Sequence, residues 1–559
     1  MRICGLKISH DGGVALVDGN RLVCSVEIEK LENNRRYSPI GCLEQVAEIL
    51  WRENVDPATV DRFVIDGWWS ASPDSPPHVE STAAGAAVDL PVAPYVEAGA
   101  HRPCLARYTF RTSHLGFADL EYSSYHHATG HLLGCYCSSP FAKRREDALI
   151  LVWDGGMTPR LYEVKGQTLE VQSLGAVLPV VGNIFGDFCG CFDPFHADKT
   201  GLTDEQVLYY DLAIAGKAMA YAALGRVEED SFKYLDEIID NLPDISTNNA
   251  RTVAGQVAAE RSGRFQGMTN ADIICTFQTY LGRQLLNSLA RLVKRRFPGG
   301  KPNLGMAGGC ALNIKWNSAV RESGIFADVW VPPFPNDSGA AIGAACAEMF
   351  CRGGVPALDW NVYSGPRADT TAAPPDWISR PADEREVAEL LHTEGEPIVV
   401  LSGRAELGPR ALGNRSILAP ATDAAMKDRL NELKGREGYR PVAPICLEGR
   451  APEIFDPGTP DPYMLFEHQV RADWARRIPA VIHLDGTARL QTIEPGSSRT
   501  GLILAEYERL SGIPVLCNTS ANFNGRGFFP DAAAAAKWGK TKYIWQDGTI
   551  YTNPAFARS

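Results

Sequence analysis

The chain has 559 residues and carries 67 acidic against 55 basic side chains, for a formal net charge of −12. Its hydrophobic content of 45% and charged content of 22% are typical of a globular protein and exclude a disordered or fibrous chain. The acidic balance argues against a nucleic-acid-binding surface, and no apolar run approaches the roughly 20 residues that a membrane helix requires.

The length exceeds what one hydrophobic core normally supports, so two or three domains are expected. The chain opens directly on a strand-like run, without the pattern of a signal peptide, which predicts a cytoplasmic location. We therefore expect neither a nucleic-acid nor a membrane partner.

Residues 1–350 alternate strand-like and helical patterns, as an α/β domain does. Residues 3–17 contain two strand-like runs around the turn 9–13 (SHDGG), which predicts a hairpin whose turn can face a ligand. Residues 148–156 repeat this plan, because a buried strand is followed by the sequence DGG. Two such strand–turn units in successive halves indicate a duplicated fold.

Further along the chain, residues 70–94 are rich in Ser, Pro and Ala and are expected to form a loop. Residues 271–297 predict an amphipathic helix whose apolar stripe belongs to the core. Residues 351–378 contain paired glycines and prolines and predict the linker to a C-terminal domain at 379–559.

A histidine cluster lies in residues 125–133 (YHHATGHLL), where His127 and His131 are four residues apart and share one face of a helix. Acids that could join them are Asp154, at a strand end, and Asp337, in a turn that leads into a helix. Two imidazoles with carboxylates suit iron or manganese better than structural zinc. The alternative is a pair of buried core histidines that bond only to protein groups.

Residues 305–313 (GMAGGCALN) place Gly308 and Gly309 at a helix start, where free backbone N–H groups can face an anion. A glycine pair alone is a weak signal, because it also serves close helix packing. Lys217 lies in the segment 216–220 (GKAMA), and its alternative role is that of an exposed helix lysine.

The C-terminal third is unusually rich in cations for an acidic chain. Residues 403–417 (GRAELGPRALGNRSI) set three arginines among three glycines, and glycines let a backbone approach a ligand whose oxygens match guanidinium forks. A local positive pocket in an anionic protein suggests a small phosphate-bearing substrate. The alternative is a tight turn pinned by surface arginines. The candidate residues are Arg410, Arg415, Lys434, Arg436, Arg440, Arg489, Asn518 and Ser520.

These segments, in this order, resemble the O-carbamoyltransferases of antibiotic and nodulation-factor biosynthesis, which include the cephalosporin and tobramycin types. The resemblance covers nearly the whole chain. It implies an actin-like ATPase domain at 1–350, the linker 351–378 and a YrdC-like α/β domain at 379–559. It also implies that the YrdC-like domain forms carbamoyl adenylate from carbamoyl phosphate and ATP. The actin-like domain would then transfer the carbamoyl group to a hydroxyl of a small acceptor.

The resemblance extends to site residues. It implies that His127, His131, Asp154 and Asp337 bind a divalent metal, that ATP binds with Mg, and that the eight C-terminal residues above bind carbamoyl phosphate and ATP. The residues that it implies for the nucleotide in the N-terminal domain are Gly155, Gly156, Gly308, Gly309, Asn313 and Lys217. The sequence AYA at 220–222 departs from the glycine-containing run that is usual in the family, which puts the role of Lys217 in doubt.

His10 is the candidate base for the acceptor hydroxyl. It lies in a glycine-bounded turn beside Asp11, and an imidazole with an ordinary pKa of about 6.5 can take a proton from an alcohol. A lone histidine in a turn is usually solvated, so this assignment depends on the resemblance. The family also has an acidic–basic segment that shapes the acceptor cleft, matched here by Glu27, Glu29, Arg35 and Arg36 without separate roles.

The mechanism expected from these features uses two sites and an enclosed passage for the labile carbamoyl adenylate. The segments 9–12 and 27–38 favour the antibiotic-tailoring branch, and a homodimer is a family-level expectation. Three other classes stay open: an actin-like sugar kinase, a tRNA threonylcarbamoylation enzyme and a non-catalytic metal-dependent scaffold. The kinase leaves the arginine-rich third without a purpose, and the tRNA enzyme would need a basic surface.

Overall fold

The computed structural model describes residues 1–70, 75–97, 103–114, 120–242, 249–371 and 373–558. The chain forms two compact units, of which unit 1 contains Met1–Ser138 together with Pro332–Ser559 and unit 2 contains Ser139–Val331. The chain thus leaves unit 1 and later returns to it. Within the described ranges, no helix combines the length and the apolar character that crossing a bilayer requires.

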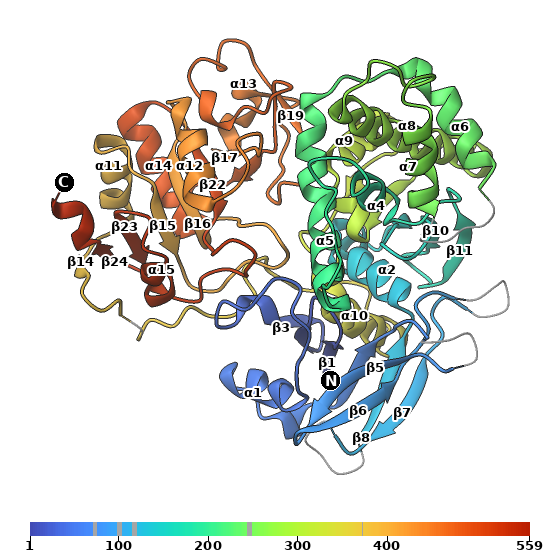
Figure 1. The fold of residues 1–559 in the computed structure, drawn as a ribbon. Coiled ribbons are helices and arrows are strands. Elements are labelled where there is room, and N and C mark those ends of the chain that lie inside the picture. Colours follow the sequence, from blue (N-terminus) through green and yellow to red (C-terminus); the bar gives the residue numbers. More distant parts are fainter. Residues whose placement is uncertain (71–74, 98–102, 115–119, 243–248, 372, 559) are drawn as a thin grey trace. The chain divides into compact units, whose positions relative to one another are not determined.

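The N-terminal sheet of unit 1 has six strands, drawn in blue in Figure 1. The central strand β1 pairs antiparallel with β2, as the predicted hairpin requires, and parallel with β4, which pairs parallel with β8. In sheet order the strands are β3 (Arg21–Glu27), β2 (Gly13–Asp18), β1 (Arg2–Lys7), β4 (Arg62–Asp66), β8 (Leu120–Tyr125) and β7 (Tyr108–Thr112).

The sheet of unit 2 has the same plan in five strands. Its strand β9 pairs antiparallel with β10 and parallel with β12, as β1 does with β2 and β4. The two topologies confirm the duplicated, actin-like α/β fold. In sheet order the strands are β11 (Val171–Ala176), β10 (Arg160–Val164), β9 (Ala148–Val152), β12 (Asn303–Ala307) and β13 (Val329–Trp330).

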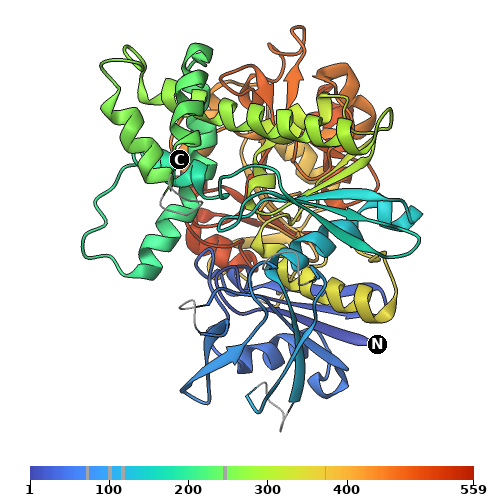
Figure 2. The same ribbon diagram turned by 90° about the vertical axis from the view of Figure 1, so that its right-hand side faces the viewer.

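The longest helix of unit 2 is α8 (Asn270–Arg296), the yellow-green helix of Figure 2, and it confirms the helix predicted at 271–297. Thr269 caps it with a capping box, and its stripe, including Phe277 and Leu285, is buried as predicted. The other helices of this unit are α3 (Pro140–Arg144), α4 (Ile184–Cys189), α5 (Asp204–Tyr221), α6 (Phe232–Asp240), α7 (Asn249–Ala259) and α9 (Ile314–Glu322).

The C-terminal part of unit 1 is built on an eight-stranded sheet, drawn in orange and red in Figure 1. In sheet order the strands are β14 (Ile378–Pro381), β24 (Thr549–Thr552), β23 (Tyr543–Gln546), β15 (Ile398–Leu401), β16 (Arg415–Pro420), β22 (Val515–Ser520), β17 (Ala443–Leu447) and β21 (Gln491–Ile493). Buried side chains such as Leu391, Ile417 and Leu504 join this sheet and its helices in one core. The helices of this part are α11 (Glu384–Thr393), α12 (Ala425–Lys434), α13 (Ala451–Ile454), α14 (Arg499–Ser511) and α15 (Ala532–Trp538).

The loop predicted at 70–94 is wrong where the structure describes it. A two-stranded hairpin forms there from β5 (His78–Ala83) and β6 (Ala86–Pro91), while residues 71–74 lie outside the described ranges. Its turn residues Ala84 and Gly85 both have positive φ, which matches the twist of a tight hairpin. An Ala-Gly turn lacks the usual Asn-Gly or Asp-Gly signal, which explains why the sequence pattern missed it.

Two helices of unit 1 approach one another through glycines. These are α2 (His127–Ser138) and α10 (Ala340–Gly353), which follows the short helix η6 (Asp337–Gly339). A Cβ at Gly343 would overlap the backbone of Gly130, so only glycine permits this distance between the helices. The close packing places the histidines of α2 beside the start of α10.

Replacing Gly343 with alanine is expected to lower the free energy of unfolding by about 1–3 kcal/mol, because the added methyl group meets backbone that cannot move cheaply. Gly353→Ala is the matched control in the same helix, since its Cβ would meet only a Val355 methyl group at 3.8 Å. Chemical denaturation of both variants checks the difference. Equal stability of the two variants would contradict this account of the packing.

Candidate active site

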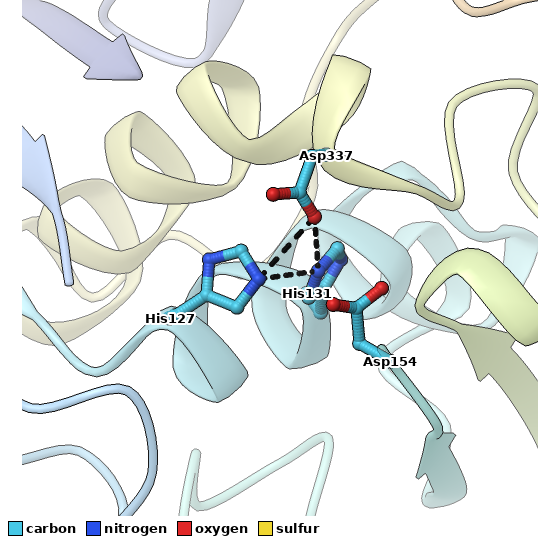
Figure 3. Close-up of side chains that lie close together, drawn as sticks. All are labelled: His127, His131, Asp154 and Asp337. Carbon is cyan, nitrogen blue, oxygen red and sulfur yellow. Dashed lines mark hydrogen bonds and ion pairs between the residues drawn. The ribbon is translucent and has the colours of Figure 1, made fainter. Parts of the chain in front are cut away.

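Three predicted metal ligands converge within unit 1, as the dashed triangle of Figure 3 shows. The Nε2 atoms of His127 and His131 are 3.0 Å apart, and each lies 3.3 Å from Oδ1 of Asp337. All three residues are buried, with at most 5% of each exposed. The helical spacing of the histidines and the turn before α10 thus bring together the atoms that the sequence predicts.

The triangle has the dimensions of three ligands on one cation. Metal–nitrogen and metal–oxygen bonds of about 2.0–2.2 Å at right angles would separate neighbouring donor atoms by about 3 Å. The His127 Nδ1 lies 2.7 Å from Oδ2 of Asp66, which assigns its proton to Nδ1 and leaves the Nε2 lone pair facing the Asp337 carboxylate. A cation between these electron-rich atoms would relieve their repulsion, so the residues fit a divalent metal.

A buried lysine supports this centre from the end of β1. Lys7 Nζ lies 3.0 Å from Asp66 Oδ2 and 2.9 Å from Asp337 Oδ2. Burial raises the pKa of both carboxyls, but the interactions with His127 and with the charge of Lys7 outweigh it and hold the pKa of each below its usual range. Both carboxylates therefore stay ionised.

The strand order explains why these residues meet. Lys7 and Asp66 end the parallel strands β1 and β4, and the next strand, β8, ends just before His126 and His127. Ligands of open α/β sheets bind outside the carboxyl ends of the strands. Lys7 and Asp66 were not predicted from the sequence, although a single charge that ends an apolar strand is a usable signal.

His10 lies in the turn after β1, beside the same centre. Its Nδ1 is 2.9 Å from Asp11 Oδ2, its Nε2 is 3.8 Å from Asp337 Oδ2, and its ring meets Trp68 edge-on at 5.3 Å. Burial raises the pKa of the Asp11 carboxyl above its usual value, while the hydrogen bond with His10 lowers it. The predicted base is thus held at Nδ1, with Nε2 directed toward the metal ligands.

In unit 2 the corresponding strand ends carry the predicted nucleotide loops. Asp154 follows β9 and accepts a hydrogen bond from the Gly309 N–H at 2.6 Å, while Gly308 has a φ of 88° and packs against Trp153 so closely that a Cβ would overlap its carbonyl. A Cβ at Gly155 would instead meet the side-chain Oδ1 of Asn183, at 2.6 Å. Figure 3 also draws Asp154.

The other predicted nucleotide residues of unit 2 have different settings. Asn313 caps α9, because its Oδ1 accepts the N–H groups of Lys315 and Trp316. Lys217 is half-buried on α5, and Gly156 lies half-buried in the turn after β9. The structure therefore joins Asp154, Gly308 and Gly309 by direct contact and leaves Lys217 on a separate helix.

The C-terminal cations form a cluster of half-buried side chains in unit 1. Arg410 and Arg489 make no ion pair with a carboxylate in the described part of the chain, and the Nε of each lacks a hydrogen-bond partner. Burial, together with the charges of neighbouring arginines, lowers the pKa of Arg489 to about 10 and of Arg436 to about 9. Burial and the charges of Arg489, Arg36 and Arg440 lower the pKa of Arg410, and burial lowers the pKa of Arg440 although the charge of Glu437 opposes it. Arg440 lies 3.7 Å from the Glu437 carboxylate, whereas Arg410 and Arg489 form no such pair among the described residues. Half-buried cations without a paired carboxylate are typical of an anion site.

Three further predicted residues bond to the backbone near this cluster or supply that backbone: Lys434, Asn518 and Ser520. Lys434 Nζ donates to the carbonyl oxygens of Ser520 and Asn522, at 2.7 and 2.8 Å. Asn518 Nδ2 donates to the carbonyl of Ala411, the residue after Arg410. These contacts join the end of β22 to the arginine-bearing loops.

Arg415 differs from the other predicted cations. It is 1% exposed, and its guanidinium donates to the carbonyl oxygens of Ser402, Gly403 and Asn414. Glu406, which was not predicted, accepts the N–H groups of Leu412, Asn414 and Arg415. We infer that both side chains hold the glycine–arginine loop in shape. In the sequence, Glu406 stands out as the only acid among the three arginines of residues 403–417, and this could have indicated its role.

A second unpredicted group, Lys30, joins this loop to the N-terminal sheet. Its Nζ is fully buried after β3 and donates to Glu27 Oε1 at 2.7 Å and to the carbonyl oxygens of Glu406 and Gly408. The Gly408 N–H donates back to Glu27 Oε1 at 2.9 Å. Burial raises the pKa of Glu27 to about 7, although the charge of Lys30 lowers it.

Lys30→Met is expected to lower the free energy of unfolding by about 3–5 kcal/mol, because it leaves the buried Glu27 and two carbonyls without their donor. The exposed Lys537 of α15 provides the control, and Lys537→Met should change stability by less than about 0.5 kcal/mol. Denaturant titration of both variants measures the difference. A Lys30→Met protein as stable as the control would show that the buried pair contributes little.

Known proteins resemble this chain over most of its length. The family model "Carbamoyltransferase N-terminus" matches residues 2–346, and "Carbamoyltransferase C-terminus" matches residues 388–544. A nodulation protein U of Rhizobium tropici is 45% identical over 100% of this chain and 97% of its own length. A 3'-hydroxymethylcephem-O-carbamoyltransferase of Amycolatopsis lactamdurans is 33% identical over 94% of each.

Among solved structures, a hexokinase from Schistosoma mansoni complexed with glucose aligns with 63% of this chain and 85% of its own. The identity is 10% and the TM-score 0.28, too low to establish a common fold. The two family segments, by contrast, follow one another in order over most of the chain, and the relatives align almost from end to end. The chain belongs to the carbamoyltransferase family.

Proposed function

We propose that the protein is an ATP-dependent O-carbamoyltransferase that works in two steps. In the first, carbamoyl phosphate, ATP and water give carbamoyl adenylate, phosphate and pyrophosphate. In the second, the acceptor hydroxyl takes the carbamoyl group, and AMP and a proton leave. The observation that carries this proposal is the cluster of arginines around Arg410 and Arg489, two cations that form no ion pair with a carboxylate among the described residues.

The arginine cluster supports the first step. Two phosphate-bearing substrates bring several negative charges to one place, and neutralising and aligning them is the main contribution that a protein can make to such a transfer. Arg410, Arg436, Arg440 and Arg489 supply the charges, and Mg would accompany ATP. Lys434, Asn518 and Ser520 would hold the surrounding loops.

The triangle of His127, His131 and Asp337 supports the second step, and we propose Asp154 as a fourth ligand. Iron or manganese suits this donor set. A divalent metal bound there would supply Lewis acidity and a template for phosphate oxygens. Gly155, Gly156, Gly308, Gly309, Asn313 and Lys217 are the residues proposed to bind the nucleotide.

His10 is proposed as the base of the second step. With its Nδ1 proton donated to Asp11, the Nε2 lone pair can accept the proton of the acceptor hydroxyl. Lys7 and Asp66 hold the neighbouring ligands, so the base and the metal ligands keep a constant geometry.

The acceptor class follows from the relatives rather than from the N-terminal segments. The identity is 45% with the nodulation protein U of Rhizobium tropici and 33% with the cephem O-carbamoyltransferase of Amycolatopsis lactamdurans. These identities favour the nodulation branch. The segments 9–12 and 27–38 by themselves favour the antibiotic branch. We propose a hydroxyl of a nodulation-factor type of natural product ahead of a cephem.

The test is the release of AMP and pyrophosphate from ATP by the purified protein, with and without carbamoyl phosphate, in the presence of each acceptor class. Strict dependence on carbamoyl phosphate, together with a carbamoylated acceptor in the mass spectrum, supports the proposal. ADP formed with a sugar and without carbamoyl phosphate would instead establish a sugar kinase. Modified tRNA would establish the tRNA enzyme.

A further inference from the structure

The segment after β3, residues 27–38, contacts the turn that carries His10. The N–H of Asp11 donates to the Tyr37 carbonyl at 3.1 Å, and the N–H of Gly12 donates to the Ser38 carbonyl at 2.9 Å. Lys30, in the same segment, donates to the glycine–arginine loop. The segment is therefore fixed to two different parts of unit 1.

The same segment pairs with the loop after β22, residues 522–527. The N–H of Arg36 donates to the Gly525 carbonyl at 3.0 Å, and the N–H of Gly527 donates to the Asn34 carbonyl at 2.9 Å. Arg526 Nη1 adds a bond to the Asn33 carbonyl at 3.1 Å. Three bonds within four residues place the backbone of Arg36 against this loop.

The loop 522–527 is in turn bound to the cation cluster. Lys434 Nζ donates to the Asn522 carbonyl, and Asn522 Nδ2 donates to the carbonyl of Arg526 at 2.8 Å. Asn524 Nδ2 donates to the carbonyl of Gly435, the residue after Lys434, at 3.2 Å. The loop 522–527 thus bonds both to the backbone of Arg36 and to Lys434, a predicted phosphate-binding residue.

The backbone on both sides of this arrangement is strained. Tyr37 has a φ of 65° and Asp11 a φ of 55°, a region that non-glycine residues enter at an energetic cost. The two are hydrogen-bonded to one another, and Glu29 Oε2 accepts the Tyr37 N–H at 3.1 Å. Each strained residue follows a functional candidate, since Asp11 follows His10 and Tyr37 follows Arg36.

The side chain of Arg36 is half-buried and makes no ion pair with an acid among the described residues. Burial lowers the pKa of Lys434, and the charges of Arg436 and Arg36 lower it further. The charge of Arg36 likewise adds to the burial and to the charge of Arg489 that lower the pKa of Arg410. The charges of Tyr37, Glu29, Asp11 and Glu27 raise the pKa of Arg36 itself, so its guanidinium lies within electrostatic reach of both these acids and the cation cluster.

We propose that Arg36 binds a phosphate group of carbamoyl phosphate or ATP, and so completes the anion site from the segment that also holds the His10 turn. The inference rests on the proposed function, because it assigns a ligand to that site. The proposal gives Arg36 a role in phosphate binding that its exposed neighbour Arg35 does not share. It also moves Arg36 from the acceptor cleft, where the resemblance places it, to the first reaction step.

The test compares Arg36→Gln with Arg35→Gln, which removes the same charge from the adjacent exposed position. The acceptor-free release of pyrophosphate is measured at varied carbamoyl phosphate and at varied ATP, so that the substrate that meets Arg36 is identified. Arg36→Gln should raise the KM for one of the two by about 10- to 100-fold, and Arg35→Gln by less than about twofold. Arg36→Lys keeps the charge but loses the two-pronged guanidinium, so its KM should lie between those of the wild type and Arg36→Gln.

Two results would overturn the assignment: KM values of Arg36→Gln equal to those of Arg35→Gln, or an effect confined to the KM of the acceptor. The wild type separates this failure from a failure of the proposed function, since pyrophosphate release that never depends on carbamoyl phosphate rejects both. A melting temperature of each variant shows whether the fold is kept. If Arg36→Gln unfolds, the Arg36→Lys values decide, and a KM for both substrates within about twofold of wild type rejects the assignment.

Discussion

Asp337→Asn is expected to lose the bound metal and to lower carbamoyl transfer by roughly 10²- to 10³-fold. Asp337 Oδ1 lies 3.3 Å from both imidazole Nε2 atoms, so an amide there removes the negative charge from the ligand triangle. The same change takes one of two carboxylates from the buried Lys7. Elemental analysis of the purified protein measures the metal, and a carbamoylated-acceptor assay measures the transfer.

The acceptor-free release of pyrophosphate separates this effect from general damage. It should persist in Asp337→Asn, because the arginine cluster does not include this residue. Asp359→Asn, at an exposed position of the same unit, is the control and should keep both the metal and the transfer. Asp66→Asn should weaken metal binding by about 10- to 100-fold, as expected for a residue that orients a ligand. Unchanged metal content in Asp337→Asn would reject the triangle as the metal centre.

Arg489→Ala is expected to reduce carbamoyl-phosphate-dependent pyrophosphate release by roughly 10²- to 10³-fold while the stability is kept or raised. Its guanidinium is half-buried without an acidic partner, and its charge lowers the pKa of Arg410 and Arg436. Removing it takes away a phosphate-binding group and also a source of repulsion. Steady-state kinetics and a denaturant titration of the same protein measure the two effects.

Arg415→Ala supplies the contrast. Because its nitrogens satisfy the carbonyls of Ser402, Gly403 and Asn414, this variant should lose stability before it loses affinity for substrate. His10→Ala should show a third pattern, with pyrophosphate release kept and transfer lost. If Arg489→Ala and Arg415→Ala behaved alike, the division between phosphate-binding and loop-supporting arginines would be wrong.

The segment 27–38 connects the two predicted centres through covalently continuous backbone. Lys30 holds the glycine–arginine loop, the backbone around Arg36 holds the loop 522–527, and the carbonyls of Tyr37 and Ser38 hold the His10 turn. In the proposed mechanism, a labile carbamoyl adenylate would have to be made and used without loss to water. The hydrogen bonds of this segment would hold the proposed base and the proposed phosphate-binding cations in a fixed arrangement.

The sequence alone determined the local elements and the chemical character of the sites. Strand–turn units around 3–17 and 148–156 and the helix at 271–297 are visible because hydrophobic periodicity depends only on neighbouring residues. Helical spacing likewise predicts that His127 and His131 share a face. The excess of arginine in an acidic chain predicts an anion site, because charge is a property of composition.

Only the tertiary structure decided which of these groups meet. Lys7 and Asp66 reach His127 because β1, β4 and β8 are parallel neighbours, which no local pattern states. Gly343 and Gly130 matter because two helices distant in sequence touch there. Arg415 and Arg489 look alike in the sequence, yet the first donates to backbone carbonyls, whereas the Nε of the second lacks a hydrogen-bond partner among the described residues. Periodicity determines the face on which a residue lies, but strand order, register and close packing determine what lies opposite, and these depend on contacts between remote parts of the chain.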